Sequence, residues 1–144
     1  MSDVLCHHRQ RDPFLRRRSL DVRRWALARG QGIDPDSLTV VLRVIDDDRD
    51  LLGVSPHEWT AERVLEFIWA RAWSWCEAEG LTLPPTAPAT LLAYLDHLHD
   101  TNSLTPSSDP ITELRDQLVA TSHIDHTYDT GAPLAPVLAL PVPT

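Results

Sequence analysis

The sequence predicts an all-α protein, a compact bundle of four to five helices around a central helix at residues 61–79. In most segments apolar residues recur at spacings of three and four, which is the period of an amphipathic helix. The 12 prolines and 5 glycines fall mainly at the ends of these segments, where such residues start or stop helices. A chain of 144 residues suits a single domain with one core.

The N-terminal residues 1–18, MSDVLCHHRQRDPFLRRR, are polar and basic and show no apolar period. We expect them to form a flexible basic arm. The single helical domain is expected to follow the arm and to span residues 19–126. In its first helix, residues 19–29, Ser19 is the expected N-cap and Gly30 is the residue just past the end.

The second segment, residues 34–45, starts with Asp34 and Pro35, a cap residue followed by a proline at the first helical position. Its run LTVVLRVI is also rich in β-branched residues, so helix and strand both stay open at residues 38–45, with helix preferred. The acidic run that follows should end this helix near Asp46, because carboxylates oppose the negative C-terminal end of a helix dipole. Ser55 then opens a capping-box pattern that predicts one short helical turn.

The central helix is expected to begin after the N-cap Thr60 and to end at Gly80. At about 100° per residue its apolar side chains cover roughly half of the circumference, which is wider than the stripe of an ordinary surface helix. We therefore expect two or more neighbouring helices to bury it, with only Phe67 on the polar side. The predicted arc consists of Ala61, Val64, Leu65, Ile68, Trp69, Ala72, Trp73, Trp75 and Cys76.

Two further helices complete the predicted bundle. The first spans residues 86–100 with Pro88 in its first turn, and the second begins after Asp109 and continues through residues 110–126. From residue 127 the helical pattern fails. Residues 127–144 end in APLAPVLALPVPT, a proline-rich and apolar tail that we expect to be extended, either against the core or free of it.

Three of the 5 tryptophans, Trp69, Trp73 and Trp75, lie within seven residues of the central helix. Core packing is the preferred interpretation, because burying indole rings contributes several kcal/mol each by area. The alternative is that the three rings form an exposed patch that binds a partner. Solvent accessibility of the rings distinguishes the two.

Charge is distributed unevenly along the chain, and all 13 basic residues are arginines. Residues 1–29 carry eight arginines and three aspartates, a net charge of +5, whereas the rest of the chain carries −13. The basic arm is the candidate for nucleic-acid contact, because arginines neutralise phosphates, while the acidic body would repel them. The candidate contact residues are Arg9, Arg11, Arg16, Arg17, Arg18, Arg23 and Arg24.

Signatures of catalysis and cofactor binding are missing from the sequence. It contains no glycine-rich phosphate loop, no Gly-x-Ser-x-Gly and no His-Glu-x-x-His. The histidine pairs do not bring four ligands together, because His97 and His99 point to nearly opposite sides of a helix. We therefore predict that the protein is not an enzyme and holds no cofactor or metal. The candidate ligands considered and set aside are Cys6, His7, His8, Asp46, Asp47, Asp50, His97, His99, His123 and His126.

The run ARAWSWCEAEGLTLPPTAPATLLAYLDHL resembles the SAM-like N-terminal core-binding domain of tyrosine recombinases, the phage integrases. The resemblance rests on Trp75-Cys76, the Gly and Leu-Pro turn after it, and Tyr94-Leu95, followed by a Leu-Arg stretch at Leu114-Arg115. It covers residues from about 60 to 130. It implies a small helical domain that clamps duplex DNA beside a catalytic domain. Since the matching residues are strongly acidic, the resemblance bears on the fold more than on DNA contact.

Location and function are predicted from what the chain contains. With only 2 cysteines, Cys6 and Cys76, and no signal peptide or apolar membrane span, we expect a cytoplasmic protein that does not enter the membrane. The preferred function is that of a non-enzymatic adaptor or regulator that binds another protein. The alternative is a DNA-binding or recombination-accessory protein that uses the arginine-rich arm.

Overall fold

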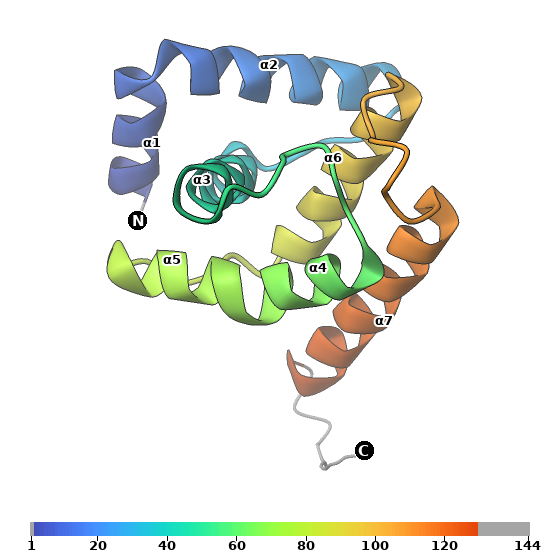
Figure 1. Ribbon diagram of the computed structural model, residues 1–144. Helices are drawn as coiled ribbons and strands as arrows, with labels where there is room; N and C mark the ends of the chain where they lie inside the picture. The colour runs from blue at the N-terminus through green and yellow to red at the C-terminus, as the bar shows by residue number, and fades with distance from the viewer. Residues whose placement is uncertain (1, 130–144) are drawn as a thin grey trace.

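A single helix lies at the centre of the molecule, and the other helices surround it. A computed structural model of the chain describes the backbone of residues 2–129 and the side chains of residues 4–120. Figure 1 shows α3 (Pro35–Leu52) end-on, between α1 (Ser2–Arg11), α2 (Pro13–Ala28), α6 (Ala87–Asp100) and a rod that contains α4 and α5. The predicted all-helical bundle is confirmed, and the described residues form no strand.

Helix α3 is more enclosed than the tryptophan-bearing helix that the sequence places at the centre. It contacts α1, α2, α5 and α6, and its apolar side chains from Leu38 to Ile45 are fully buried, whereas Leu51 and Leu52 at its end are exposed. Because this apolar stretch is covered on all sides, α3 forms the middle of the core. The buried apolar residues of α3 are Leu38, Val40, Val41, Leu42, Val44 and Ile45.

Helix α3 begins where the sequence predicts, but it ends later than predicted. Asp34 accepts hydrogen bonds from the backbone of Asp36 and Ser37, so the Asp-Pro start signal operates and residues 38–45 are helical. The helix does not stop near Asp46 but continues to Leu52 and ends at Gly53, whose φ is 68°. Arginines from other helices neutralise the carboxylates that should have stopped it. Arg18, for example, donates a 2.7 Å hydrogen bond from Nη2 to Asp46 Oδ2.

The N-terminal residues are helical and packed, in place of the expected arm. Leu5 of α1 and Leu15 of α2 are fully buried in the core. Helix α2 begins at Asp12, which accepts hydrogen bonds from the backbone N–H groups of Phe14 and Leu15, and not at Ser19, which is buried in mid-helix. Each helix therefore has one leucine in the core, and burial of this side chain holds the helix against α3.

The rod below α3 consists of α4 (Ala61–Glu66), a π-helical turn η1 (Phe67–Arg71) and α5 (Ala72–Ala78). As predicted, Thr60 caps its start through a hydrogen bond from the backbone N–H of Arg63, and the chain leaves its end at Gly80 with φ 72°. A π-turn contains about one extra residue, which rotates everything after it by roughly 100° relative to an uninterrupted α-helix. The buried face is therefore narrower than the predicted arc, and it includes Phe67, which the uniform 100° step placed on the polar side.

Helices α6 and α7 (Ile111–Asp129) close the other side of the bundle. Helix α7 packs against α6 and α4. Ser55 starts a single turn rather than a helix. The start of α4 is tied to the loop that precedes α7, because the backbone N–H of Ala61 donates a 2.8 Å hydrogen bond to Asp109 Oδ2. Of the predicted tail, residues 127–129 belong to α7, and residues 130–144 lie outside the described residues.

None of the helices in the described part of the chain combines the length and the hydrophobicity that a bilayer span requires.

Candidate partner-binding groove

A row of exposed apolar side chains runs along the outer face of the α4–α5 rod. Leu65, Trp69 and Trp73 are 41%, 44% and 50% exposed. They are spaced four residues apart, and in an uninterrupted α-helix such a spacing drifts by about 40° per step. The π-turn removes most of this drift, so the three side chains lie in one row. The same extra residue turns Phe67 and Ile68 into the core.

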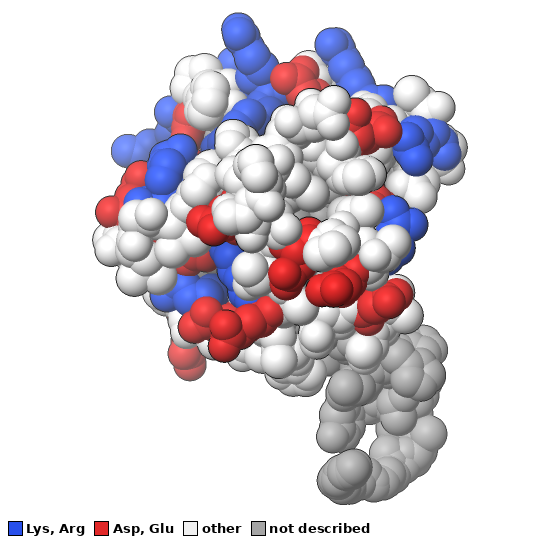
Figure 2. All heavy atoms as spheres, turned by 45° about the vertical axis from the view of Figure 1, so that its right-hand side comes forward, with Lys and Arg blue, Asp and Glu red and all other residues white. Residues whose placement is uncertain are grey.

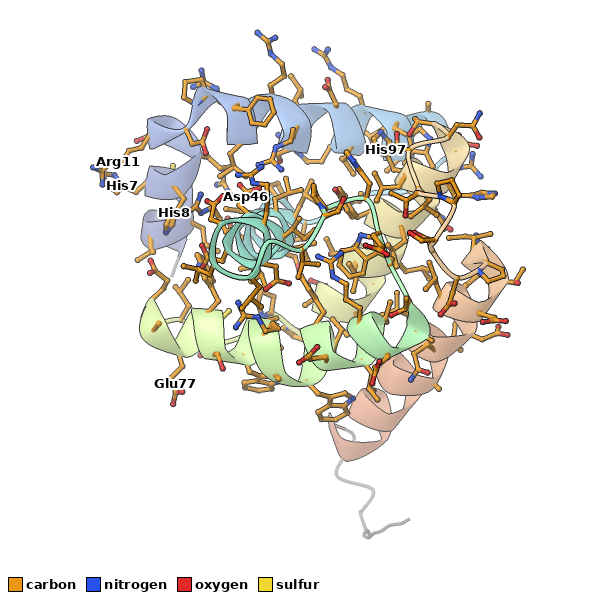
Figure 3. The ribbon with its side chains drawn as sticks, viewed as in Figure 1. His7, His8, Arg11, Asp46, Glu77 and His97 are labelled. Atoms are coloured by element: carbon orange, nitrogen blue, oxygen red, sulfur yellow. The ribbon has the colours of Figure 1, made fainter. Side chains whose placement is uncertain are left out.

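The two indoles of this row line a shallow groove of about 380 Å³, which we call the tryptophan groove. Leu81, in the segment after α5, forms its far wall, and Glu77 is the only charged residue along it. Figure 3 shows Glu77 pointing away from the body of the molecule, on the side of α5 opposite α2. The residues that line the tryptophan groove are Trp69, Ala70, Trp73, Ser74, Glu77, Leu81 and Thr82.

The third tryptophan of the sequence cluster does not belong to the groove. Trp75 is only 8% exposed and faces α1, where its ring centre lies 5.4 Å from that of His8. His8 in turn forms a 3.0 Å contact between Nε2 and Glu79 Oε1. The structure therefore splits the predicted trio. Trp75 anchors α1 on α5, as the core interpretation proposed, whereas Trp69 and Trp73 form an outward surface.

The tryptophan groove suits the binding of an extended, apolar chain rather than a reaction. Its walls are two indole faces and aliphatic carbon, and Glu77 at its edge is its sole titratable group. Shallow aromatic grooves of this kind bind polyproline-type segments through ring stacking and hydrophobic contact. Leu65 lengthens the apolar row toward α4.

The seven arginines predicted to contact nucleic acid divide into three groups. Arg9 donates from Nη1 to Asp36 Oδ1 and Thr39 Oγ1, at 3.0 and 2.8 Å, and Arg18 is bound to Asp46. These two hold helices together and are not free for phosphate. Figure 2 shows arginines projecting from the edge formed by α2, with acidic side chains gathered further down the molecule. Among the described residues, no hydrogen bond or ion pair engages the exposed side chains of Arg16, Arg17 and Arg24.

The remaining two arginines of the set are less available. Arg11 donates from Nη1 to His7 Nε2 over 3.3 Å, on the outer side of α1 in Figure 3. Arg23 is half-buried, and its Nε is enclosed without a hydrogen-bond partner. The structure therefore gathers a smaller cationic face on α2 than the sequence suggested.

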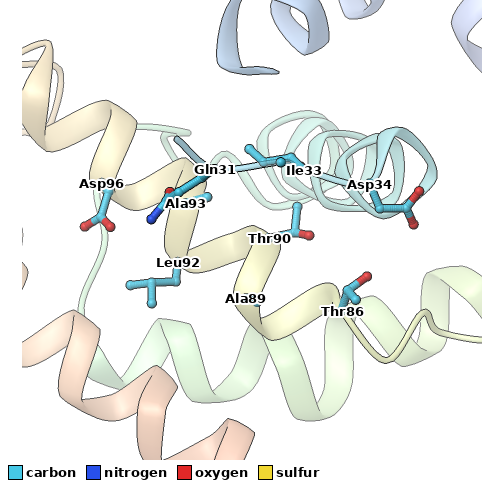
Figure 4. Close-up of a pocket in the computed structure, with 10 residues that line it drawn as sticks. Gln31, Ile33, Asp34, Thr86, Ala89, Thr90, Leu92, Ala93 and Asp96 are labelled. Carbon is cyan, nitrogen blue, oxygen red and sulfur yellow. The ribbon is translucent and has the colours of Figure 1, made fainter. Parts of the chain in front are cut away.

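A second hollow, of about 430 Å³, lies between the segment before α3 and the outer face of α6 (Figure 4). It holds two carboxylates, and both are engaged: Asp34 caps α3, and Asp96 pairs with Arg115 of α7. Thr86, also at its edge, donates to Ser37 Oγ at 2.9 Å. Both carboxylates are already committed to structural contacts, so this hollow is a weaker candidate than the tryptophan groove.

His97 and Cys76 are used in packing. His97 points from α6 toward α2 (Figure 3), where its ring meets that of Trp25 edge-on at 5.3 Å. Burial lowers the pKa of His97, against the opposing effect of Asp21 and Asp100. Burial raises the pKa of the Cys76 thiol to about 11, which makes this cysteine a poor nucleophile and metal ligand. His123 and His126 lie where the structure describes no side chains.

Within the described residues, no three His, Cys, Asp or Glu side chains converge in the way that a metal ion requires. The acidic run of α3 is built into ion pairs instead. Asp46 contacts Arg18, and Asp48 contacts Arg71 and Arg63. These carboxylates are buried inside the bundle and serve to hold it together.

Sequence reasoning missed two members of the candidate site, Leu65 and Leu81. The uniform 100° step places Leu65 in the buried arc, and Leu81 lies beyond the end of the predicted helix at residues 61–79. One signal was present: Val64, Ile68, Ala72 and Cys76 repeat three times at a spacing of four. Such a run is too long for a straight α-helix to keep on one narrow face, and a π-turn restores its alignment.

The segment that resembles the recombinase core-binding domain, about residues 60–130, forms α4 through α7. Its resemblance to that family stays a prediction. Comparison of the whole chain with protein-family models, with curated proteins and with solved structures finds no match in any of the three.

Proposed function

We propose that this protein is a non-enzymatic adaptor or regulator that binds an extended apolar segment of a partner protein in the tryptophan groove. The observation that carries this proposal is the exposure of Trp69 and Trp73, at 44% and 50%, side by side on one helix face. By contrast, Phe67 of the same rod and Trp59, which precedes it, are fully buried. Two indoles left in water next to each other mark a surface that another chain covers.

The exposed surface supports weak to moderate binding. About half of an indole side chain corresponds to roughly 100 Å², so covering both rings contributes about 2–3 kcal/mol each at ~25 cal/mol per Å². Part of this free energy offsets the entropy lost on association. A dissociation constant of about 1 mM or weaker for a short peptide follows, and a partner protein with additional contacts would bind more tightly.

The partner segment is expected to be uncharged and rich in proline. Glu77 is the only charge along the groove, and it disfavours an acidic segment. A polyproline helix is extended before it binds, so it loses little conformational entropy and presents flat rings to the indoles. A segment with prolines three residues apart places successive prolines on one edge, where they can contact Trp69 and Trp73 together.

Peptide titration of the full chain tests this function. The probe is an uncharged twelve-residue peptide with a Pro-x-x-Pro core, and the measurement follows the indole N–H signals of the protein by NMR. We expect the signals of Trp69 and Trp73 to shift, and those of Trp25, Trp59 and Trp75 to stay in place. The double variant Trp69→Ala/Trp73→Ala should lose binding, whereas Trp25→Ala, on the opposite side of α3, should keep it. Equal binding by the double variant, or none at several millimolar peptide, would overturn the proposal.

A second candidate function is contact with nucleic acid through Arg16, Arg17 and Arg24, which the described residues leave unpaired on α2. With about three phosphate contacts, the logarithm of the affinity for duplex DNA should fall with the logarithm of salt concentration at a slope of roughly −3. Replacement of the three arginines by Gln should remove this binding. Arg115→Gln, on the distant helix α7, is the matched control.

A further inference from the structure

The last fifteen residues of the sequence, TGAPLAPVLALPVPT, have the chemistry that the tryptophan groove is suited to bind. They contain no charged side chain, and their spacing has a period of three. Pro133 and Pro136 are three residues apart, and so are Leu134, Val137 and Leu140. A polyproline helix has three residues per turn, so in that conformation the prolines would share one edge and the aliphatic side chains the next.

These residues follow directly on a helix that leads toward the groove. Helix α7 ends at Asp129 and packs against α4, the part of the rod that carries Leu65. Figure 1 shows its C-terminal end beyond α4, on the side of the rod away from α2, and Glu77 of the groove points to that side as well (Figure 3). Fifteen residues in an extended conformation reach about 45 Å at ~3.1 Å per residue, which exceeds the roughly 28 Å length of the rod.

We propose that residues 132–141 of the same chain dock in the tryptophan groove, with their prolines against the indoles of Trp69 and Trp73. This inference rests on the proposed function, because it assigns the groove an internal occupant that competes with the partner's segment. The tail is uncharged like the expected partner segment, and it is tethered nearby. Tethering by a short linker gives an effective concentration of about 1–10 mM.

Competition by the tail has a measurable consequence. If the tail binds the groove as weakly as a free peptide, with a dissociation constant near 1 mM, it occupies the groove for about half to nine tenths of the time. Since only the remaining grooves are free, binding of a partner segment is weakened roughly two- to tenfold. The protein would respond only to partners that displace the tail.

The test compares the full-length chain with the full-length variant Pro133→Ser/Pro136→Ser, which keeps the length and the aliphatic side chains but loses the two prolines that would contact the indoles. In the variant, the indole N–H signals of Trp69 and Trp73 should move, while that of Trp59 in the core stays. The Pro-x-x-Pro peptide should bind the variant about two- to tenfold more tightly than the parent chain. The matched control is Thr130→Ser/Thr144→Ser, which changes the tail outside the docking residues and should match the parent.

Each outcome separates the two proposals. If parent and variant bind the peptide equally well and show identical indole signals, the docking of the tail is wrong and the partner-binding function stands. If the variant shifts the indole signals but neither protein binds the peptide, the tail docks and the partner-binding function is wrong. If the signals of the parent change on tenfold dilution, the tail binds a second copy of the chain, and docking within one chain is overturned.

Discussion

Arg71 donates a 2.7 Å hydrogen bond from Nε to Asp48 Oδ1, and this contact joins the π-turn of the rod to the central helix α3. Asp48 is almost fully buried, and its other oxygen lies 3.7 Å from Arg63 Nη2. Arg63 in turn stacks 3.8 Å from the ring centre of Trp59. One carboxylate inside the bundle therefore holds two arginines of the rod in place, and it fixes the rotation of the helix that presents the tryptophan groove.

Replacement of Asp48 by Asn should strongly destabilise the protein. Without the carboxylate charge, Arg63 and Arg71 keep their charges in a partly buried place, and breaking such a pair costs about 3–5 kcal/mol. The measurement is the free energy of unfolding in urea. Asp50→Asn is the matched control, because Asp50 pairs with Arg49 at the exposed surface and its loss should cost less than about 1 kcal/mol. Similar losses in both variants would mean that the buried ion pair does not hold the rod.

Deletion of Ala70, an exposed residue of the π-turn, should be tolerated. Without the extra residue the rod becomes a regular α-helix, and Trp75 and Cys76 keep their buried positions, because the π-turn is equivalent to one inserted residue. Insertion of one alanine after Ala70 should instead turn both side chains by about 100° and unfold much of the bundle. Circular dichroism during thermal unfolding compares the two variants. A deletion that is as harmful as the insertion would contradict this account of the turn.

Removing an exposed indole should cost less stability than removing a buried one. Trp73→Ala should lower the free energy of unfolding by about 2 kcal/mol, because only the buried half of the side chain, roughly 100 Å², contributes at ~25 cal/mol per Å². Trp59→Ala should lower it by about 3–5 kcal/mol, since the ring is fully buried against Phe67 and its Nε1 donates to the carbonyl of Pro56. Acrylamide quenching of fluorescence is an independent readout, and Trp69→Phe/Trp73→Phe should remove most of the accessible signal.

The stability of the protein should fall below neutral pH, in part because of His97. Burial holds the pKa of His97 in the folded protein below its usual value of 6.5, so the unfolded chain takes up a proton more readily. This contribution to stability is fully present above about pH 6.5 and is lost as the pH falls below that value. Urea unfolding at pH 7 and pH 5 should show a smaller difference for His97→Gln than for the parent. His99→Gln, on the exposed side of α6, should behave like the parent.

Local signals of the sequence predicted helix ends well, and their failures have physical causes. Asp34-Pro35, Thr60 and Gly80 start or end helices as expected. Asp12-Pro13 carries the same start signal, but it lies in a strongly charged segment that the sequence predicts to be flexible. These residues are held in place because Leu5 and Leu15 are buried in a core that later segments complete. Local sequence patterns do not predict such a contact.

Two features of the packing could not be derived from local patterns. The uniform helical step assumed for residues 61–79 misplaced Phe67, because one π-turn shifts the register of all that follows. The pairing of Arg18 with Asp46 joins residues 28 positions apart and depends on how α2 lies on α3. The sequence thus predicted a cluster of three rings, and the tertiary packing leaves Trp69 and Trp73 exposed and buries Trp75.

The enclosure of α3 by helices from both halves of the chain has a consequence for synthesis on the ribosome. When α3 leaves the exit tunnel, only α1 and α2 are available to shield its aliphatic side chains, since α5 and α6 come later in the chain. The remaining residues up to Asp100 take about 2–10 s to translate at ~5–20 residues per second. During that interval the nascent chain exposes part of the apolar surface of α3. We therefore expect it to depend on a ribosome-bound chaperone more than its small size suggests.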